Sequence, residues 1–153
     1  MIKILFVCHG NICRSTMAEF LFRDLATKNG LLHELQIASA ATSREELGNP
    51  PHPGTRAKLA CAGISTHGKT AVQMTCQDYH YYDYIFGMDR MNIKNILRIT
   101  GGDPDGKVFR LLDLTNHPRD IADPWYTGNF ETTYQDILEG CNALLKKLQE
   151  EIQ

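Results

Sequence analysis

Near the N-terminus a cysteine and an arginine stand six positions apart, within the segment Cys8-His9-Gly10-Asn11-Ile12-Cys13-Arg14-Ser15. The segment follows the apolar run 2–7 and precedes a helical pattern that opens at Ser15. Five intervening residues are enough to curl the backbone into a half-circle whose N–H groups point inward at one tetrahedral anion. The spacing therefore predicts a phosphate-binding loop with a thiol at its base.

The residue types in this loop suit phosphoryl transfer. A ring of amides, a helix N-terminus and Arg14 all favour the thiolate of Cys8, which is the nucleophilic form. The planar guanidinium of Arg14 can hold two phosphoryl oxygens at once. Ser15 can donate a hydrogen bond to the Cys8 sulfur and can also cap the following helix, and we expect it to do both. Gly10 and Asn11 tolerate the positive φ angles of a tight turn. We expect the phosphate to be bound by His9, Gly10, Asn11, Ile12, Cys13 and Ser15.

A second segment, Asp123-Pro124-Trp125-Tyr126, supplies what the loop lacks. Transfer of a phosphoryl group from an alcohol or phenol needs a proton donor for the leaving oxygen. Asp123 offers a carboxyl group held before a proline, and Trp125 and Tyr126 can flank a planar substrate. After the phenol departs, the same carboxylate can take a proton from the water that attacks the cysteinyl phosphate. The chemistry needs no metal and no cofactor.

Alternating strands and helices must position these residues. Short apolar runs predict four strands, each buried on both faces as in a parallel sheet, at 1–7, 35–40, 84–88 and 108–112. Helical spacing covers 16–28, 55–62 and 92–99, and a long apolar stripe predicts a last helix up to residue 152. The segments 48–54, 101–106 and 117–128 are predicted as loops. The fold class is thus α/β: a four-stranded parallel sheet flanked by helices on both faces, with the phosphate-binding loop after the first strand. Ligands of such sheets bind beyond the carboxyl ends of the strands, where Cys8, the Ser39 region, Asp89 and the 113–127 loop are expected to meet.

Composition narrows the class of protein. A length of 153 residues predicts a single domain over 1–153. Sixteen basic and eighteen acidic residues, without a basic block, do not indicate a nucleic-acid partner. No stretch approaches the roughly 20 apolar residues of a membrane span, so we expect a cytoplasmic protein. Five cysteines without the spacing of a disulfide framework fit free thiols, and Cys61, Cys76 and Cys141 are expected in the core.

One further motif is typical of a different class of protein, the nucleotide-binding enzymes. Residues 63–70, Gly-Ile-Ser-Thr-His-Gly-Lys-Thr, fit the G-x-x-x-x-G-K-T pattern of nucleotide-binding loops. Such a loop must follow a strand and open a helix, whereas here a helical stretch precedes Gly63 and no clear helix follows. We therefore do not expect an NTPase.

Taken together, the loop 8–15 with Met17-Ala18-Glu19 after it, Ser39-Ala40, Met88-Asp89 and Asp123-Pro124-Trp125-Tyr126 resemble the low-molecular-weight protein tyrosine phosphatases over nearly the whole chain. The resemblance implies a phosphotyrosine protein or small aryl phosphate as substrate and inorganic phosphate as product. It implies that Cys8 is the nucleophile, Arg14 the phosphate clamp and Asp123 the general acid. It also implies that Asn11, Ser39 and His67 buttress the loop, and that Cys13 pairs with Cys8 in a reversible disulfide.

The chain departs from the family pattern at the mouth of the predicted site. His9 replaces a usual leucine, Thr16 a proline and Ala41 a glycine, and the charged residues 44–46 stand where many members carry a Trp-His wall. A charged mouth predicts a preference among peptides of different charge or for a small phosphate ester.

Three other functions use a similar loop. Arsenate reductases need two closely spaced redox cysteines that this chain lacks, and arginine phosphatases carry threonine at the position of Ile12. A noncatalytic phosphate-binding module would have no need of both Cys8 and Asp123. These alternatives rank below a phosphatase.

Overall fold

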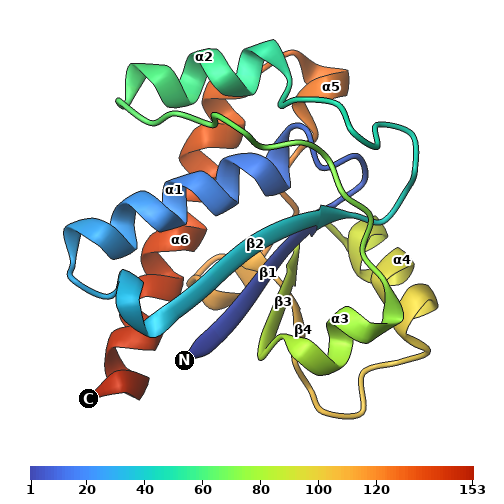
Figure 1. The fold of residues 1–153 in the computed structure, drawn as a ribbon, viewed down its shortest axis with the longest axis vertical. Coiled ribbons are helices and arrows are strands. Elements are labelled where there is room, and N and C mark those ends of the chain that lie inside the picture. The colour runs from blue at the N-terminus through green and yellow to red at the C-terminus, as the bar shows by residue number, and fades with distance from the viewer.

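The computed structural model describes residues 1–153, and its centre is a four-stranded parallel sheet in the order β2-β1-β3-β4 (Figure 1). The strands are β1 (Ile2–Cys8), β2 (Leu35–Ala41), β3 (Tyr84–Gly87) and β4 (Val108–Arg110). In the register of the sheet, Cys8 at the end of β1 lies beside Ala41, and Val7 lies beside Gly87. The strand ends that carry the predicted site therefore share one edge of the sheet.

Helices cover both faces of the sheet, which confirms the predicted fold class. Helices α1 (Arg14–Lys28), α2 (Pro53–Cys61) and α6 (Phe130–Ile152) lie on one side, and α3 (Cys76–Tyr81) and α4 (Arg90–Thr100) lie on the other (Figure 1). A single helical turn, α5 (Pro124–Thr127), precedes α6, and short 3₁₀ turns occupy Leu32–Glu34 and Leu111–Leu114. None of these helices combines the length and apolarity needed to cross a membrane.

The alternation of side chains along β1 explains why both faces need cover. Ile4, Phe6 and Cys8 belong to the larger apolar core against α1 and α6, whereas Leu5 and Val7 belong to a smaller core against α3 and α4. All five are at most 3% exposed. Because successive side chains of a strand point to opposite faces, a strand buried on both faces has to be apolar throughout. Cys8 extends this pattern to the last residue of the strand.

The structure corrects several predicted boundaries. The fourth strand ends at Arg110 instead of residue 112, because Leu111 begins a 3₁₀ turn. Two short helices were missed, α3 and α5, the second of which lies inside the predicted loop 117–128. Both are too short to show helical periodicity in their apolar residues.

Chain connectivity opens a crevice at the carboxyl edge of the sheet. From β1 the chain passes through α1 to β2 on one side, and it later returns to β3 on the other side of β1. Such a reversal of strand order leaves the space above the central strand free for a ligand. The loop 9–13 occupies this position, between the end of β1 and the start of α1 (Figure 1).

Candidate active site

The sulfur of Cys8 lies at the base of the loop and receives hydrogen bonds from its far end. The backbone N–H groups of Asn11 and Ser15 donate to Sγ at 3.3 and 3.5 Å, and Ser15 Oγ lies 3.0 Å from it. All of these residues are at most 3% exposed. Donors aimed at one sulfur stabilise negative charge on it. Ser15 lies inside the first turn of α1, with Cys13 as the N-cap residue, so the expectation that Ser15 caps the helix is wrong.

The curl of the loop depends on Asn11. Its φ of 58° is the only positive φ of a non-glycine residue in the chain. This left-handed conformation costs less free energy for asparagine than for most other residues. The same expectation for Gly10 is wrong, since its φ is not positive. A Cβ at Gly10 would lie 3.4 Å from Cγ of Glu46, which is an ordinary van der Waals contact, so space does not require glycine there either.

Arg14 is buried and held by two carboxylates and a carbonyl. Its guanidinium donates to Asp89 Oδ2 at 2.6 Å, to the carbonyl of Ile121 at 2.8 Å and to Asp123 Oδ2 at 3.4 Å. Burial acts to lower the pKa of Arg14, but the Cys8 sulfur and these carboxylates outweigh it and raise the pKa above the ordinary value. Arg14 is therefore a fixed positive charge beside the Cys8 sulfur.

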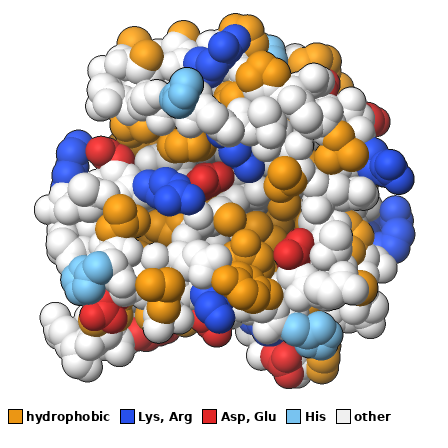
Figure 2. Space-filling model, viewed as in Figure 1, with side chains coloured by type: hydrophobic (Ala, Val, Ile, Leu, Met, Phe, Trp, Pro, Cys, Tyr) orange, Lys and Arg blue, Asp and Glu red, His pale blue; other side chains and the backbone are white.

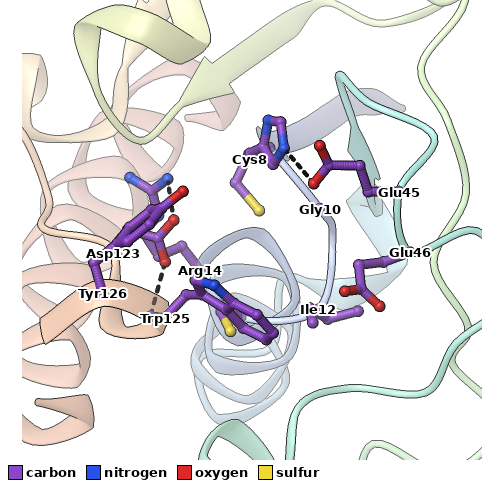
Figure 3. Close-up of a pocket in the computed structure, with 11 residues that line it drawn as sticks. Cys8, Gly10, Ile12, Arg14, Glu45, Glu46, Asp123, Trp125 and Tyr126 are labelled. Carbon is purple, nitrogen blue, oxygen red and sulfur yellow. Dashed lines mark hydrogen bonds and ion pairs between the residues drawn. The ribbon is translucent and has the colours of Figure 1, made fainter. Parts of the chain in front are cut away.

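Asp123 owes its position to helix α5. It is the N-cap residue of that turn, where Oδ1 accepts a hydrogen bond from the N–H of Trp125 at 3.0 Å and Pro124 occupies the first helical position. N-capping and a proline at N1 fix the direction in which a helix starts. The other carboxylate oxygen points toward Arg14 and into the pocket (Figure 3).

Cys8, Arg14 and Asp123 line a single pocket with contrasting walls (Figure 3). One wall is aromatic, with Trp125 57% and Tyr126 83% exposed, and the other is acidic, with Glu45 and Glu46. The pocket is also lined by His9, Gly10, Ile12 and Cys13. The side chain of His9 turns away to the rim, where Nε2 lies 2.9 Å from Glu45 Oε2. The aromatic wall is braced from behind, since the ring of His52 meets that of Trp125 edge to face.

A buried polar network supports the loop from behind. The Nδ2 of Asn11 donates to Ser15 Oγ at 2.8 Å and to Ser39 Oγ at 2.9 Å, and Ser39 Oγ donates to Glu19 Oε1 at 2.6 Å. The predicted contribution of His67 is wrong: its side chain is exposed, and its backbone N–H bonds only to Ser65.

Lys69 reaches the network in place of His67. Its Nζ donates to the carbonyl of Ser39 at 3.1 Å and lies 3.7 Å from Glu19 Oε1. Burial lowers the pKa of Lys69 below its ordinary value, although the Glu19 carboxylate opposes the change. Nothing in the local sequence distinguished Lys69 from a surface lysine except its place in the motif 63–70.

The family model described as low molecular weight phosphotyrosine protein phosphatase matches residues 3–153. The chain belongs to this family. The low molecular weight protein-tyrosine-phosphatase YfkJ of Bacillus subtilis (strain 168) is 46% identical to it, with 100% of this chain and 99% of the relative covered. PtpA of Staphylococcus aureus (strain Newman), a protein of the same description, is 38% identical over 95% of this chain and 92% of its own length.

Solved structures agree with this membership. The crystal structure of YfkJ matches this low-molecular-weight phosphatase fold with a TM-score of 0.97, at 46% identity, covering 100% of this chain and 98% of the other. A structure described as DARP, a Drosophila arginine phosphatase, matches with a TM-score of 0.87 at 28% identity, covering 96% and 98% of the two chains. The fold of the family is thus found in proteins described by different substrates.

The second cysteine of the loop differs from the first in its surroundings. Burial, followed by the charges of Cys8 and Asp123, raises the pKa of Cys13 to about 12, so this thiol stays protonated at neutral pH. Both loop cysteines are free thiols here, and their pairing in a disulfide stays a prediction. Cys141 is buried as expected, whereas the prediction of core positions for Cys61 and Cys76 is wrong because both are exposed.

The structure also clarifies the motif at residues 63–70 of this phosphatase-family chain. Helix α2 ends before it at Cys61, and the next helix, α3, begins only at Cys76. The motif therefore lacks the strand-loop-helix context of a nucleotide-binding loop, as the sequence indicated. Its lysine is engaged with Glu19 and Ser39 instead.

Proposed function

We propose that this protein hydrolyses phosphotyrosine and other aryl phosphate monoesters through a cysteinyl phosphate formed on Cys8. The observation that carries the proposal is the convergence of Cys8, Arg14 and Asp123 on one pocket whose base is lined by amide donors. Family membership supports the same reaction, since the curated relatives are described as protein tyrosine phosphatases.

In the first step the Cys8 thiolate attacks phosphorus and forms the S–P bond while the bond to the aryl oxygen breaks. Arg14 and the loop amides hold the three equatorial oxygens, whose charge needs fixed positive partners. Asp123, in its protonated form, gives its proton to the departing oxygen, so that a neutral phenol leaves. Its position on the side of the pocket opposite the acidic wall supports this role (Figure 3).

In the second step a water molecule attacks the cysteinyl phosphate. Asp123, now a carboxylate, accepts a proton from that water, the S–P bond breaks, and inorganic phosphate and the thiolate are released. The hydroxyl of Ser15, 3.0 Å from Sγ, stabilises the thiolate as it leaves. The enzyme returns to its starting state without a metal or cofactor in the cycle.

The walls of the pocket suit an aromatic substrate. The rings of Trp125 and Tyr126 stand at its entrance, where they can flank a phenyl ring bound through its phosphate. Ile12 lines the loop without a hydroxyl group, whereas threonine is expected at this position of an arginine phosphatase. We therefore favour phosphotyrosine over phosphoarginine as the substrate. The need for a reduced Cys8 favours the cytoplasm as its location.

The test is hydrolysis of p-nitrophenyl phosphate in reducing buffer, with and without a chelator. We expect activity that the chelator does not change, that Cys8→Ser abolishes, and that Asp123→Asn lowers by about 10²–10⁴-fold, the usual contribution of a general acid. A phosphotyrosyl and a phosphoarginyl peptide of the same sequence are then compared. Faster release of phosphate from the phosphoarginyl peptide would refute the assigned substrate, and an inactive native chain would refute the reaction.

A further inference from the structure

A single chain of hydrogen bonds links helix α1 and strand β2 to the Cys8 sulfur. It runs from Glu19 through Ser39, Asn11 and Ser15 to Sγ, with donor-acceptor distances of 2.6, 2.9, 2.8 and 3.0 Å. Every member is at most 5% exposed. Water therefore does not compete for these groups. Each serine hydroxyl donates its proton to one partner within the chain of hydrogen bonds.

The direction of each bond follows from the chemistry of the two fixed members. As a carboxylate, Glu19 can only accept, so the hydroxyl of Ser39 donates to it. The Oδ1 of Asn11 accepts from the N–H of Val72 at 3.2 Å, which turns both Nδ2 protons toward the two serine oxygens. Ser15 Oγ thus accepts from Asn11, and its own proton is left to bond with the Cys8 sulfur.

The charge of Glu19 sets the direction of the Ser39 bond and polarises the bonds that follow it in the chain. A buried carboxylate needs a cation nearby to remain ionised. Arg23 Nε donates to Oε2 at 3.1 Å but its side chain is 41% exposed, whereas the Lys69 side chain, 3.7 Å from Oε1, is only 12% exposed. Over helix α1, acidic and basic side chains lie side by side in the hollow beneath α2 (Figure 2).

We propose that the Glu19–Lys69 pair orients the Ser39 hydroxyl and so strengthens, by polarisation, the hydrogen bonds that end on the Cys8 sulfur, which makes both of them positioning residues for the reaction. The inference rests on the proposed role of Cys8 as nucleophile. Neither side chain lines the pocket, so neither touches the substrate. Their effect passes through Ser39, Asn11 and Ser15 to the stability of the thiolate.

The test uses substitutions that keep the shape of a side chain and change its charge. In Glu19→Gln the end of the chain can donate as well as accept, and in Lys69→Met the buried cation is lost. Lys69→Arg keeps the charge and serves as the rescue variant. Arg14 and the two carboxylates that bond to it, Asp89 and Asp123, are left in place in all three proteins.

Two measurements are made on each variant. The first is steady-state hydrolysis of p-nitrophenyl phosphate, where we expect kcat to fall about tenfold in Glu19→Gln and Lys69→Met, with little change in KM, as for the loss of one hydrogen bond to a charged atom. The second is the rate of Cys8 carboxymethylation by iodoacetate across pH, followed by mass spectrometry. We expect its profile to move to higher pH in both variants and to return toward that of the native protein in Lys69→Arg.

The matched control is Lys28→Met, which removes the exposed ion pair with Asp24 on the same helix. It is expected to leave kcat and the alkylation profile unchanged. If Glu19→Gln and Lys69→Met lower the melting temperature but leave the alkylation profile in place, the pair is structural only and the inference is refuted. A shifted profile in a protein without phosphatase activity would uphold the inference about the sulfur and refute the proposed reaction.

Discussion

Arg14 is the residue on which both carboxylates of the site converge, and they hold it unequally. Asp89 lies 2.6 Å from one terminal nitrogen, whereas Asp123 lies 3.4 Å from the other. Asp89 is also tied to the N-terminus of α4, where Oδ1 accepts from Asn92 N–H at 2.7 Å. We infer that Asp89 anchors the guanidinium, whereas the longer contact holds Asp123 to it less tightly.

The hydrogen bond from Ser15 to the Cys8 sulfur can be tested with a single substitution. Ser15→Ala removes the hydroxyl 3.0 Å from the Cys8 sulfur and keeps the backbone N–H that donates to the same atom. We expect hydrolysis of the cysteinyl phosphate to slow by about tenfold, because the departing thiolate loses a hydrogen-bond donor. Rapid mixing with p-nitrophenyl phosphate then shows a burst of phenol release before the steady state. Thr27→Ala, an exposed hydroxyl on the same helix, is the control, and a native-like time course for Ser15→Ala would contradict the role of the hydroxyl.

Some residues of the site could be predicted from the sequence and others could not. The difference is whether the residue stands in a short motif or acts with a residue far away in the sequence. Cys8 and Arg14 stand in one short motif, and Asp123 stands in another with its own proline and aromatic residues. Glu19 and Lys69 are 50 positions apart and look like ordinary charged residues until the fold buries them together. The predicted role of His67, two positions from Lys69, depends on the resemblance alone. Only the path of the chain between α2 and α3 decides which of the two side chains points inward.

The two short helices begin at residues that typically cap a helix, but they are too short to show a helical period in their apolar residues. Helix α5 has an aspartate N-cap and a proline at N1, and α3 begins after Thr75, whose N–H donates to Asp78 Oδ2 at 2.8 Å. Such caps mark helix starts but do not by themselves show that a helix continues. The long helix α6, in contrast, was predicted from its apolar stripe, which the core now buries.

The contact of α6 with the 3₁₀ turn Leu111–Leu114 depends on a residue without a side chain. A Cβ at Gly140 would lie 2.5 Å from Cγ of Leu111, an atom that cannot move without the whole side chain. We expect Gly140→Ala to lower the free energy of unfolding by about 1 kcal/mol. Overpacking costs about 1–3 kcal/mol, and the better helix propensity of alanine offsets up to about 1 kcal/mol of this cost. Urea unfolding measures the change.

Two further variants separate packing from propensity. Asn142→Ala, at an exposed position of α6, is expected to be neutral or stabilising. Leu111→Ala removes the clashing atoms, so the effect of Gly140→Ala should reverse sign in its background. Equal effects of Gly140→Ala in both backgrounds would contradict the packing argument.

In the molecule as a whole, Asp103 links the edge strand β4 to helix α3. Its carboxylate accepts hydrogen bonds from Tyr79 Oη at 2.7 Å, Lys107 N–H at 2.9 Å and Val108 N–H at 3.1 Å. Burial acts to raise the pKa of Asp103, but these donors outweigh it, and the pKa lies below the ordinary value of 3.8. The folded state therefore binds this proton less tightly than the unfolded chain does.

The consequence is a dependence of stability on pH with a definite sign. Since the folded pKa is depressed, the contribution of Asp103 is fully present well above pH 3.8 and is lost as the pH falls through the folded pKa. We expect Asp103→Asn to be less stable than the native protein by about 1 kcal/mol at neutral pH, with the difference disappearing in acid. Urea unfolding at a series of pH values measures it, and a difference that is constant down to the most acidic point would contradict the assignment.

The charges at the mouth of the pocket affect which substrates approach it. The acidic wall of the pocket, Glu45 and Glu46, faces the aromatic wall across the space that a phosphotyrosine would fill (Figure 3). Only His9 pairs with Glu45, and Glu46 accepts a hydrogen bond from the neutral amide of Asn49. Residues beside the phosphotyrosine therefore enter a field that attracts positive charge and repels negative charge.

We expect kcat/KM for a phosphotyrosyl peptide with lysines beside the phosphotyrosine to exceed that for a matched peptide with glutamates by about threefold to tenfold at low salt. The ratio should shrink as salt screens the exposed carboxylates, and it should approach one in the double variant Glu45→Gln, Glu46→Gln. Turnover of p-nitrophenyl phosphate, which has no flanking residues, normalises each variant for its intrinsic activity. Equal turnover of the two peptides by the native enzyme would show that the acidic wall does not select substrates, and specificity would then depend on the ring contacts of Trp125 and Tyr126 alone.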